Sequence, residues 1–449
     1  MQARCLGSSF LLMVWLAAGA EAVAQDELRR VGKTFTVVLH PGKWKAELAA
    51  TLADAALAAA ESARPVLEKL QLRPTKLPTI HVYAAESDYR DAEKKHAPQP
   101  FLLEAFCRPA AAEAHVGLLP RLDEAVLQRI GLPPIIAETV IEQAAMLAAY
   151  ERAEWLAKDP WAAKVIACGV VDAVAYPGTK AGVDPGYDTR RNWLVTEARA
   201  GRAGKLRDSL SVIPAMDRPH FDAQGEWQVG IAQLLAGSNT GWARKLLANP
   251  SPDLKSDAAR RAAAIEAVLG KDWNKIEERC AKLLTATTVR WRVGGQHVAL
   301  RGGSIMMAAA DRVAQLMALA PPPTAPYAIR GAATMHSHGL TSLRVQLDES
   351  APEVIVCVFQ ANKVQIMQVR LGSSDWKELA SAAATVPFDR AFEFEVAVGD
   401  AVTASIDGVQ VVSHPLGQRS LPGAWSILTQ ESLVLLDGLR CEAVKPAKK

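Results

Sequence analysis

The sequence is poor in aromatic residues, in net charge and in long apolar stretches, and each shortage excludes something. Only 6% of the 449 residues are aromatic, so alanine and aliphatic residues must supply most of the core. Lys and Arg (51) barely outnumber Asp and Glu (48), and a net charge of +3 is too small to indicate a nucleic-acid-binding protein. After the first 24 residues no run of about 18 uncharged apolar residues occurs, so no transmembrane helix is predicted.

What is present fits a globular chain. Half of the residues are hydrophobic and 22% are charged, which excludes a wholly disordered protein. At roughly 100–200 residues per domain, the length predicts two or three domains.

The N-terminus has the three parts of a signal peptide. Arg4 gives a short positive region, Phe10 to Leu16 form an apolar stretch too short to span a membrane, and Ala22-Val23-Ala24 is a small-x-small cleavage site. We therefore expect residues 1–24 to be removed after Ala24 and the protein to be secreted or periplasmic. The alternative is a buried N-terminal helix.

Cysteine is scarce and its spacing excludes a zinc ribbon, because no two of the six cysteines form a CxxC pair. Removal of Cys5 leaves five, an odd number, so at least one thiol stays free or pairs between chains. A Cys357–Cys441 disulfide is one pairing that an oxidising compartment would allow. The alternative is that Cys357, inside the apolar run Val354 to Phe359, acts as a small hydrophobic residue.

Residues 25–287 alternate strands and helices and then become mainly helical. Strands are predicted over 35–39, 79–83 and 113–119, with a helix from Lys43 to Leu70 that Pro65 kinks or splits. From about residue 122 onward the period is helical. Pro133-Pro134 opens one helix and Asp159-Pro160 opens the next.

From residue 288 the hydrophobic period changes to two. Short strand-like runs recur to residue 444, and Asp407-Gly408 between two of them is a strong signal for a two-residue hairpin turn. Such a pattern predicts an all-β sandwich. Residues 445–449 form a basic tail that we expect to be frayed.

The layout of residues 35–284 resembles the peptidase-MA-like gluzincin metallopeptidases. In that family two histidines of an HExxH helix and a glutamate of the next helix hold zinc, and the glutamate after the first histidine is the general base. The resemblance places Glu138 at the base position, with Ala137 and Ile141 in the two histidine positions. Cys168, before Gly169, takes the position of the third ligand. Alanine and isoleucine cannot bind a metal, so no zinc, no other cofactor and no catalysis are expected.

The helix that contains Glu138 could also hold a different kind of metal site. Glu138 and Glu142 share a helix face, and Cys168 or Asp172 would give them an oxygen- and sulfur-rich metal cluster. The alternative is that these two glutamates have no function, one being a remnant of the family's site and the other a solvated side chain. Cys168 is then a buried, unreactive thiol rather than a nucleophile. A hydrolase with an unrecognised site around Glu138 stays open. His81, His96 and His115 fall on separate elements, and each is expected to be a surface or satisfied histidine.

The order of strand motifs over residues 288–444 resembles the concanavalin A-like jelly roll of the laminin-G and glucanase type. Such domains commonly bind glycans. Glu393 and Glu395 are expected on the solvated side of one strand. His336 and His338 share one side of an extended segment, without a visible third metal ligand. Trp376 is either an aromatic for sugar stacking or a residue that caps the core.

The sequence therefore predicts a multidomain protein: an α+β gluzincin-like N-terminal domain followed by an all-β jelly-roll sandwich. The main hypothesis for function is an exported, catalytically inactive pseudopeptidase that binds a partner. The alternative is a carbohydrate-binding adhesin in which the jelly roll is the active part. In both cases a glycan or a cell-envelope component is the expected partner of the C-terminal domain, and nucleic acid is not.

Overall fold

The computed structural model describes residues 27–97, 105–117, 127–128, 131–157, 160–175, 194–195, 198, 204–210, 231–232, 234–237, 241–248, 256–286, 291–294, 298–301, 304–336, 342–349, 351–370 and 376–444. The predicted signal peptide and the basic tail lie outside these residues. Among the described helices, none is long and apolar enough to cross a membrane.

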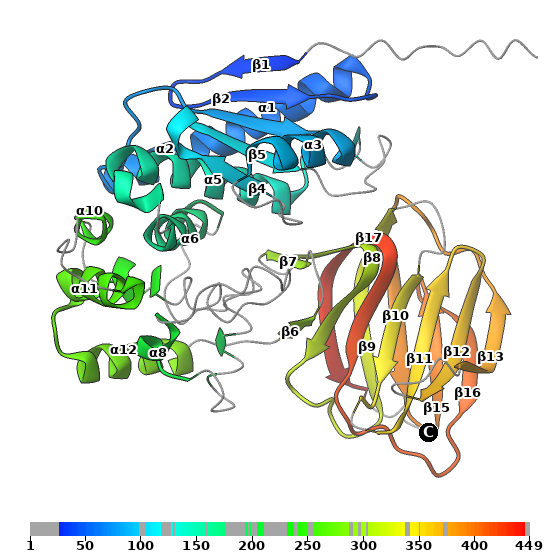
Figure 1. Cartoon of the computed structure of the whole chain (residues 1–449). Coiled ribbons are helices and arrows are strands. Elements are labelled where there is room, and N and C mark those ends of the chain that lie inside the picture. The colour runs from blue at the N-terminus through cyan, green and yellow to red at the C-terminus, as the bar shows by residue number, and fades with distance from the viewer. Residues whose placement is uncertain are drawn as a thin grey trace, which may run out of the picture.

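A five-stranded mixed sheet organises the N-terminal region (Figure 1). Its spatial order is β1-β2-β3-β5-β4, with β2, β3 and β5 parallel and the two edge strands antiparallel to their neighbours. The strands are β1 (Leu28–Val31), β2 (Thr36–His40), β3 (Thr79–Tyr83), β4 (Ala105–Arg108) and β5 (Glu113–Gly117).

Helices cover both faces of this sheet and continue beyond it (Figure 1). The predicted break at Pro65 is confirmed, because one helix ends at Ser62 and the next begins at Arg64 with Pro65 in its first turn. The described helices are α1 (Ala46–Ser62), α2 (Arg64–Lys69), α3 (Glu86–His96), η1 (Pro109–Ala111), α5 (Pro134–Arg152), η2 (Glu154–Ala157), α6 (Trp161–Ala175), α8 (Leu206–Ser209), α10 (Trp242–Leu247), α11 (Asp257–Leu269) and α12 (Trp273–Ala286).

The two faces of the sheet have different chemistry. Side chains alternate along a strand, so Ile80 and Val82 of β3 point into the large apolar core beneath α1 and α5. His81 and Tyr83 point to the opposite face, where helix α3 packs. Among the residues that the structure describes, that face has one small apolar cluster, built by Tyr83, Tyr89 and Phe106. The covering of this second face is therefore largely polar.

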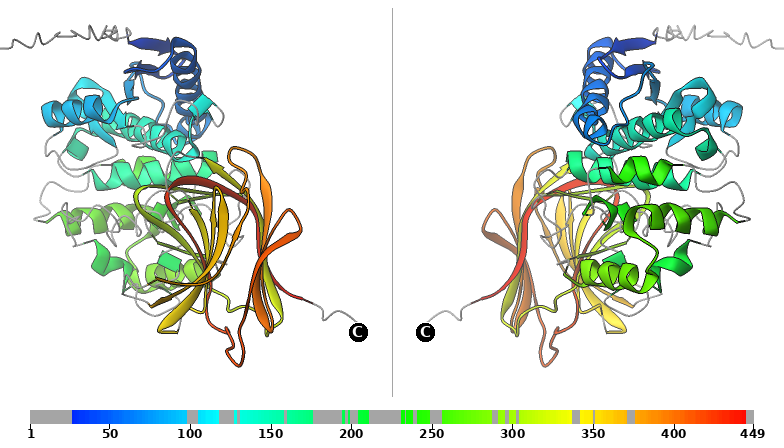
Figure 2. Two further views of the ribbon diagram at one scale, coloured as in Figure 1. Left: turned by 90° about the vertical axis from the view of Figure 1, so that its right-hand side faces the viewer. Right: turned by 90° about the vertical axis from the view of Figure 1, so that its left-hand side faces the viewer.

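The C-terminal region is a β-sandwich built around one long strand (Figure 2). β17 (Ser426–Ala443) pairs through its first half with β10 and through its second half with β9, so it passes from one sheet to the other. The other strands are β6 (Trp291–Gly294), β7 (Val298–Arg301), β8 (Ser304–Ala318), β9 (Tyr327–His336), β10 (Ser342–Leu347), β11 (Glu353–Gln360), β12 (Lys363–Arg370), β13 (Trp376–Ala383), β14 (Phe392–Val398), β15 (Ala401–Ile406) and β16 (Val409–Pro415).

The predicted α+β N-terminal part and β-sandwich C-terminal part are both confirmed. The hairpin at Asp407-Gly408 is present, and both residues have the positive φ (49° and 78°) that such a turn needs. The suggested Cys357–Cys441 disulfide is wrong, because both thiols are free. Cys357 is fully buried in the sandwich core, where it acts as a small apolar side chain.

The two regions touch through apolar side chains. Met306 of β8 and Leu433 of β17 belong to the buried cluster that forms the N-terminal core rather than to the core of the sandwich. The same strand that joins the two sheets thus also packs against the helical region.

Candidate binding surfaces of the β-sandwich

The positions that the gluzincin resemblance assigns to zinc ligands lie on two packed helices, α5 and α6. Ile141 and Cys168 are 4% and 6% exposed and belong to one apolar core cluster. Ala137 and Ile141 have no atom that can donate to a metal, so these residues do not fit a zinc ion. Glu138, the proposed remnant base, lies half-buried on α5.

The alternative oxygen- and sulfur-rich cluster also lacks support from the geometry. Glu142 on α5 and Asp172 on α6 are half-buried. Within the ranges that the structure describes, no three His, Cys, Asp or Glu side chains gather closely enough to hold a metal ion.

A contact that sequence reasoning missed lies beside this helix. The Cys107 thiol donates to Oε1 of buried Gln143 at 2.9 Å. Burial, reinforced by the nearby Glu142 carboxylate, raises the pKa of Cys107 far above its ordinary value. The thiol therefore stays protonated and is a structural hydrogen-bond donor, not a nucleophile.

The outer face of the sheet formed by β10 to β13 has an apolar floor. Val354, Val356 and Val358 alternate on β11 with side chains that point away from the sandwich core. Val369 and Met367 of β12 complete this valine floor. An apolar patch on the outward face of a sheet is unusual unless side chains or a ligand cover it.

Trp376 and Arg344 reach over the valine floor from opposite sides. Trp376, the first residue of β13, is in register with Val369, while Arg344 of β10 is in register with Val358, so both share the outer face. The guanidinium carbon of Arg344 lies 5.2 Å from the centroid of the Trp376 ring. Trp376 nevertheless remains 44% exposed. It lies over the outer valine cluster and not over the core of the sandwich.

A carboxylate is held beside this indole. Glu378, two residues after Trp376 on β13, accepts hydrogen bonds from Ser381 (2.7 Å) and from the side-chain amide of Gln365. These hydrogen bonds, first that from Ser381, lower the pKa of Glu378. An exposed aromatic ring, a guanidinium and an oriented carboxylate thus share the outer face of this sheet. The valines beneath them are at most 8% exposed, so neighbouring side chains already cover the floor.

A second feature, a hollow of about 520 Å³, lies on the other sheet of the sandwich. Its lining comes from β9, β14, β17 and the turn at Gly408. The strand β17 bulges between Asp437 and Arg440, so Gly331 of β9 lies opposite the bulge. A Cβ at Gly331 would lie 3.2 Å from the Phe394 ring and 3.3 Å from the Asp437 carbonyl oxygen, which requires glycine here.

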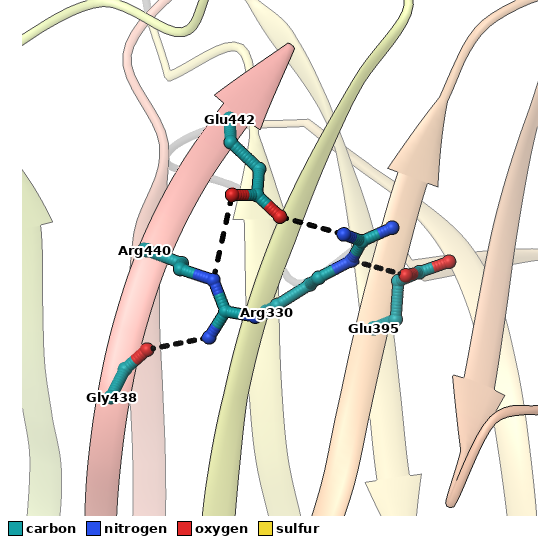
Figure 3. Close-up of polar contacts among 5 residues, drawn as sticks. All are labelled: Arg330, Glu395, Gly438, Arg440 and Glu442. Atoms are coloured by element: carbon teal, nitrogen blue, oxygen red, sulfur yellow. Dashed lines mark hydrogen bonds and ion pairs between the residues drawn. The ribbon is translucent and has the colours of Figure 1, made fainter. Parts of the chain in front are cut away.

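Ion pairs form one side of the hollow (Figure 3). Arg330 donates from Nε to Glu395 and from Nη1 to Glu442, the latter at 2.6 Å. Arg440 adds a contact to Glu442 at 3.5 Å and donates to the Gly438 carbonyl. Arg330 therefore links three neighbouring strands, β9, β14 and β17. Since its own charge is already paired, this network is better suited to hold the bulge than to bind a further anion.

The glutamates and histidines singled out in the sequence occupy well-defined positions in the structure. Glu393 and Glu395 do point outward from β14, but Glu395 pairs with Arg330 instead of being merely solvated. His336 is 5% exposed and its Nδ1 lies 3.0 Å from Oδ1 of Asp389, while His338 lies outside the described residues. His81, His96 and His115 do fall on separate elements, β3, α3 and β5, but the sequence did not predict that they meet. The parallel register of β3 and β5 and the position of α3 bring their rings together.

Comparisons with known proteins were made with sequences and with structures. No protein-family model matches the chain, and no curated protein sequence is significantly similar to it. Solved structures that are similar include the carbohydrate-binding module CBM66 from Bacillus subtilis (11% identity, TM-score 0.30), which covers 34% of this chain and 96% of that one. A protein of unknown function with a galectin-like fold from Bacillus subtilis has 10% identity and a TM-score of 0.29, over 34% of this chain and 88% of that one. The exoplasmic/lumenal domain of VIP36 in its Ca²⁺/Man3GlcNAc-bound form has 11% identity and a TM-score of 0.29, over 36% and 86%.

Proposed function

We propose that the protein binds saccharides on the outer face of the sheet formed by β10 to β13, where the exposed Trp376 lies above the buried valine floor. The observation that carries the proposal is the exposed indole, which Arg344 contacts on the same face as the oriented carboxylate of Glu378. A pyranose ring has an apolar face of C–H groups and a rim of hydroxyls. An aromatic platform therefore binds the face, while planar polar side chains bind the rim.

The polar side chains suit this task. Glu378 has two oxygens that accept from hydroxyl groups, and Ser381 and Gln365 already fix its orientation. A side chain that is held in place loses little conformational entropy on binding, which favours affinity. The guanidinium of Arg344 adds donors at the edge of the ring.

The test is binding of the full-length protein to a glycan array, followed by calorimetry with each saccharide that binds. Trp376→Ala is expected to weaken binding at least tenfold, about 1.4 kcal/mol, because an exposed central aromatic residue is a typical hot spot. Val409→Ala is the matched control, since Val409 is an exposed apolar side chain (67%) on β16, which pairs with β15 and with none of the strands β10 to β13. No bound saccharide, or equal binding by the Trp376 variant, would contradict the proposal.

For the N-terminal domain we propose a non-catalytic role in an exported protein. The support is chemical: Ala137, Ile141 and Cys168 occupy the positions where the resemblance requires His, His and Glu. Zinc analysis of the purified protein tests this, and stoichiometric zinc that depends on Glu138 would overturn it.

A further inference from the structure

Four histidines stack on the sheet face that helix α3 covers. We call His40 of β2, His81 of β3, His115 of β5 and His96 of α3 the histidine ladder. The ring centroids of His40 and His81 are 5.3 Å apart, those of His81 and His115 are 4.8 Å apart, and His96 stacks on His115 at 5.7 Å. The parallel pairing places His81 directly opposite His115, while His40 lies opposite Tyr83, whose ring it stacks on at 4.3 Å.

The hydrogen bond between His40 and His81 excludes a pair in which both rings are charged. Nε2 of His40 lies 3.0 Å from Nδ1 of His81, so one nitrogen must offer a lone pair to the proton of the other. Two protonated rings would place two N–H groups against each other. Tyr83 Oη lies 2.9 Å from His115 Nδ1, and its hydroxyl can donate to this nitrogen or accept from it.

His115 is the member that tolerates charge least. Its side chain is 3% exposed, and its Nε2 is buried without a hydrogen-bond partner. The carboxylate of Glu113 is 3.9 Å from this nitrogen, but it already pairs with Arg108 at 2.7 Å. A second proton on the ring, which puts an N–H on both nitrogens, would therefore create a buried cation whose nearest anion is shared with an arginine.

Other charges around the ladder do not offset this cost. Glu27 lies 3.3 Å from His40 Nδ1 but is 65% exposed, so solvent weakens the attraction. On α3, Asp88 faces His40, Lys95 lies near His96, and the buried Glu93 pairs with Arg90 at 2.9 Å. Burial lowers the pKa of His40 and His81. At His115 burial, followed by the neighbouring His81 and His96, lowers the pKa to about 3.

Helix α3 is the element that this cost can displace. Tyr89 and Glu93 are its only buried residues, and it packs chiefly against β3 and β5. The opposite face of the same sheet is secured by the large apolar core beneath α1 and α5. Protonation of the ladder therefore weakens the packing on the face of the sheet that has fewer apolar contacts.

We propose that the histidine ladder is an acid-sensitive latch, in which protonation of its imidazoles releases helix α3 from the sheet while the rest of the fold stays closed. The sign follows from linkage. A histidine that binds its proton more weakly when closed than when open favours the closed state at neutral pH, and this advantage is lost as the pH falls below about 6.5. If opening takes up one proton, the opening constant rises about tenfold per pH unit. If it takes up two, the rise is about a hundredfold.

Hydrogen exchange of the full-length protein between pH 7.5 and pH 4.5 tests the latch, after correction for intrinsic exchange rates. Residues 86–96 are expected to lose protection by at least about tenfold per pH unit below pH 6, while residues 392–398 in the sandwich keep theirs. Equal loss in both segments, or unchanged protection of residues 86–96 at pH 4.5, would overturn the proposal.

Two further measurements identify the ladder as the cause. His115→Phe keeps a ring between Phe106 and His81 but cannot take up a proton. Opening of α3 in this variant should therefore take up about one proton fewer, and its exchange should depend less steeply on pH. His414→Gln on β16 is the matched control and should change nothing. Because a variant can fail to fold, the histidine resonances of the wild-type protein are also titrated by NMR. If His40, His81 and His115 all titrate near pH 6.5, the proposal is wrong.

Discussion

The guanidinium carbon of Arg344 lies 5.2 Å from the centre of the Trp376 ring, although β11 and β12 separate their two strands. The valine side chains between them are short enough to leave room for both long side chains. Arginine supports the indole from one side and tryptophan keeps an exposed surface. This relationship makes the sheet face a shallow platform whose floor is apolar and whose edges are polar.

Replacing Arg344 tests that support. Arg344→Met keeps the length and apolar stem of the side chain but removes the charge and the planar donors. We expect saccharide affinity to fall about three- to tenfold and the free energy of unfolding to change by less than about 1 kcal/mol, because exposed cation–π contacts are weak. Calorimetry and urea unfolding measure the two effects. A large loss of stability with unchanged affinity would show that Arg344 only packs.

Glu378 gives the proposed site a defined pH dependence. Hydrogen bonds from Ser381 and Gln365 stabilise its carboxylate and lower its pKa below the ordinary value. The charged form, which accepts from sugar hydroxyls, is therefore fully populated at neutral pH and is lost only as the pH falls through the lowered pKa. We expect saccharide affinity to be constant from pH 8 to about pH 5 and to decrease below that.

The matched variant for this pH dependence is Glu378→Gln. It should bind more weakly and show no carboxyl-dependent decrease at acid pH. If the variant keeps the wild-type pH profile, another group is responsible.

How much the sequence could predict differed between local and long-range features. Period-two alternation located the strands, and Pro65 correctly marked the break between α1 and α2. The full length of β17 is not evident in the sequence, because a bulge between Asp437 and Arg440 interrupts the alternation within the continuing strand. β8 likewise runs through Ala308-Ala309-Ala310, where the sequence has no alternation.

The contacts that the sequence did not predict are mainly those between segments that are distant along the chain. His81 and His115 are 34 positions apart, and only the register of two parallel strands makes them neighbours. No local pattern contains that register, so the sequence predicts no contact between these histidines. The same applies to Arg344 and Trp376, because their approach depends on the order of four strands.

The ion pairs of Arg330 should stabilise the bulge modestly. Arg330 and its partners Glu395 and Glu442 are about one-third to two-fifths exposed, so water screens them. We expect Arg330→Met to lower the free energy of unfolding by about 1 kcal/mol at low ionic strength and by less in 0.5 M salt. Arg440→Met, which removes a longer contact from a more exposed side chain, should cost less than about 0.5 kcal/mol. Equal costs at both salt concentrations would show that Arg330 acts through packing instead.

Gly331 offers the sharpest test of the bulge geometry. An added methyl group would lie 3.2 Å from a carbon of the Phe394 ring and 3.3 Å from the Asp437 carbonyl oxygen, so both neighbours would have to shift by a few tenths of an ångström, and the Phe394 ring is buried in the sandwich core. Gly331→Ala should therefore lower the free energy of unfolding by about 1–3 kcal/mol, as overpacking usually does. Gly399→Ala is the matched control, since a methyl group there meets only Pro326 at an ordinary 3.7 Å. Denaturant unfolding of the two variants should separate them by at least about 1 kcal/mol, and equal stabilities would mean that β9 and β17 can move apart at the bulge.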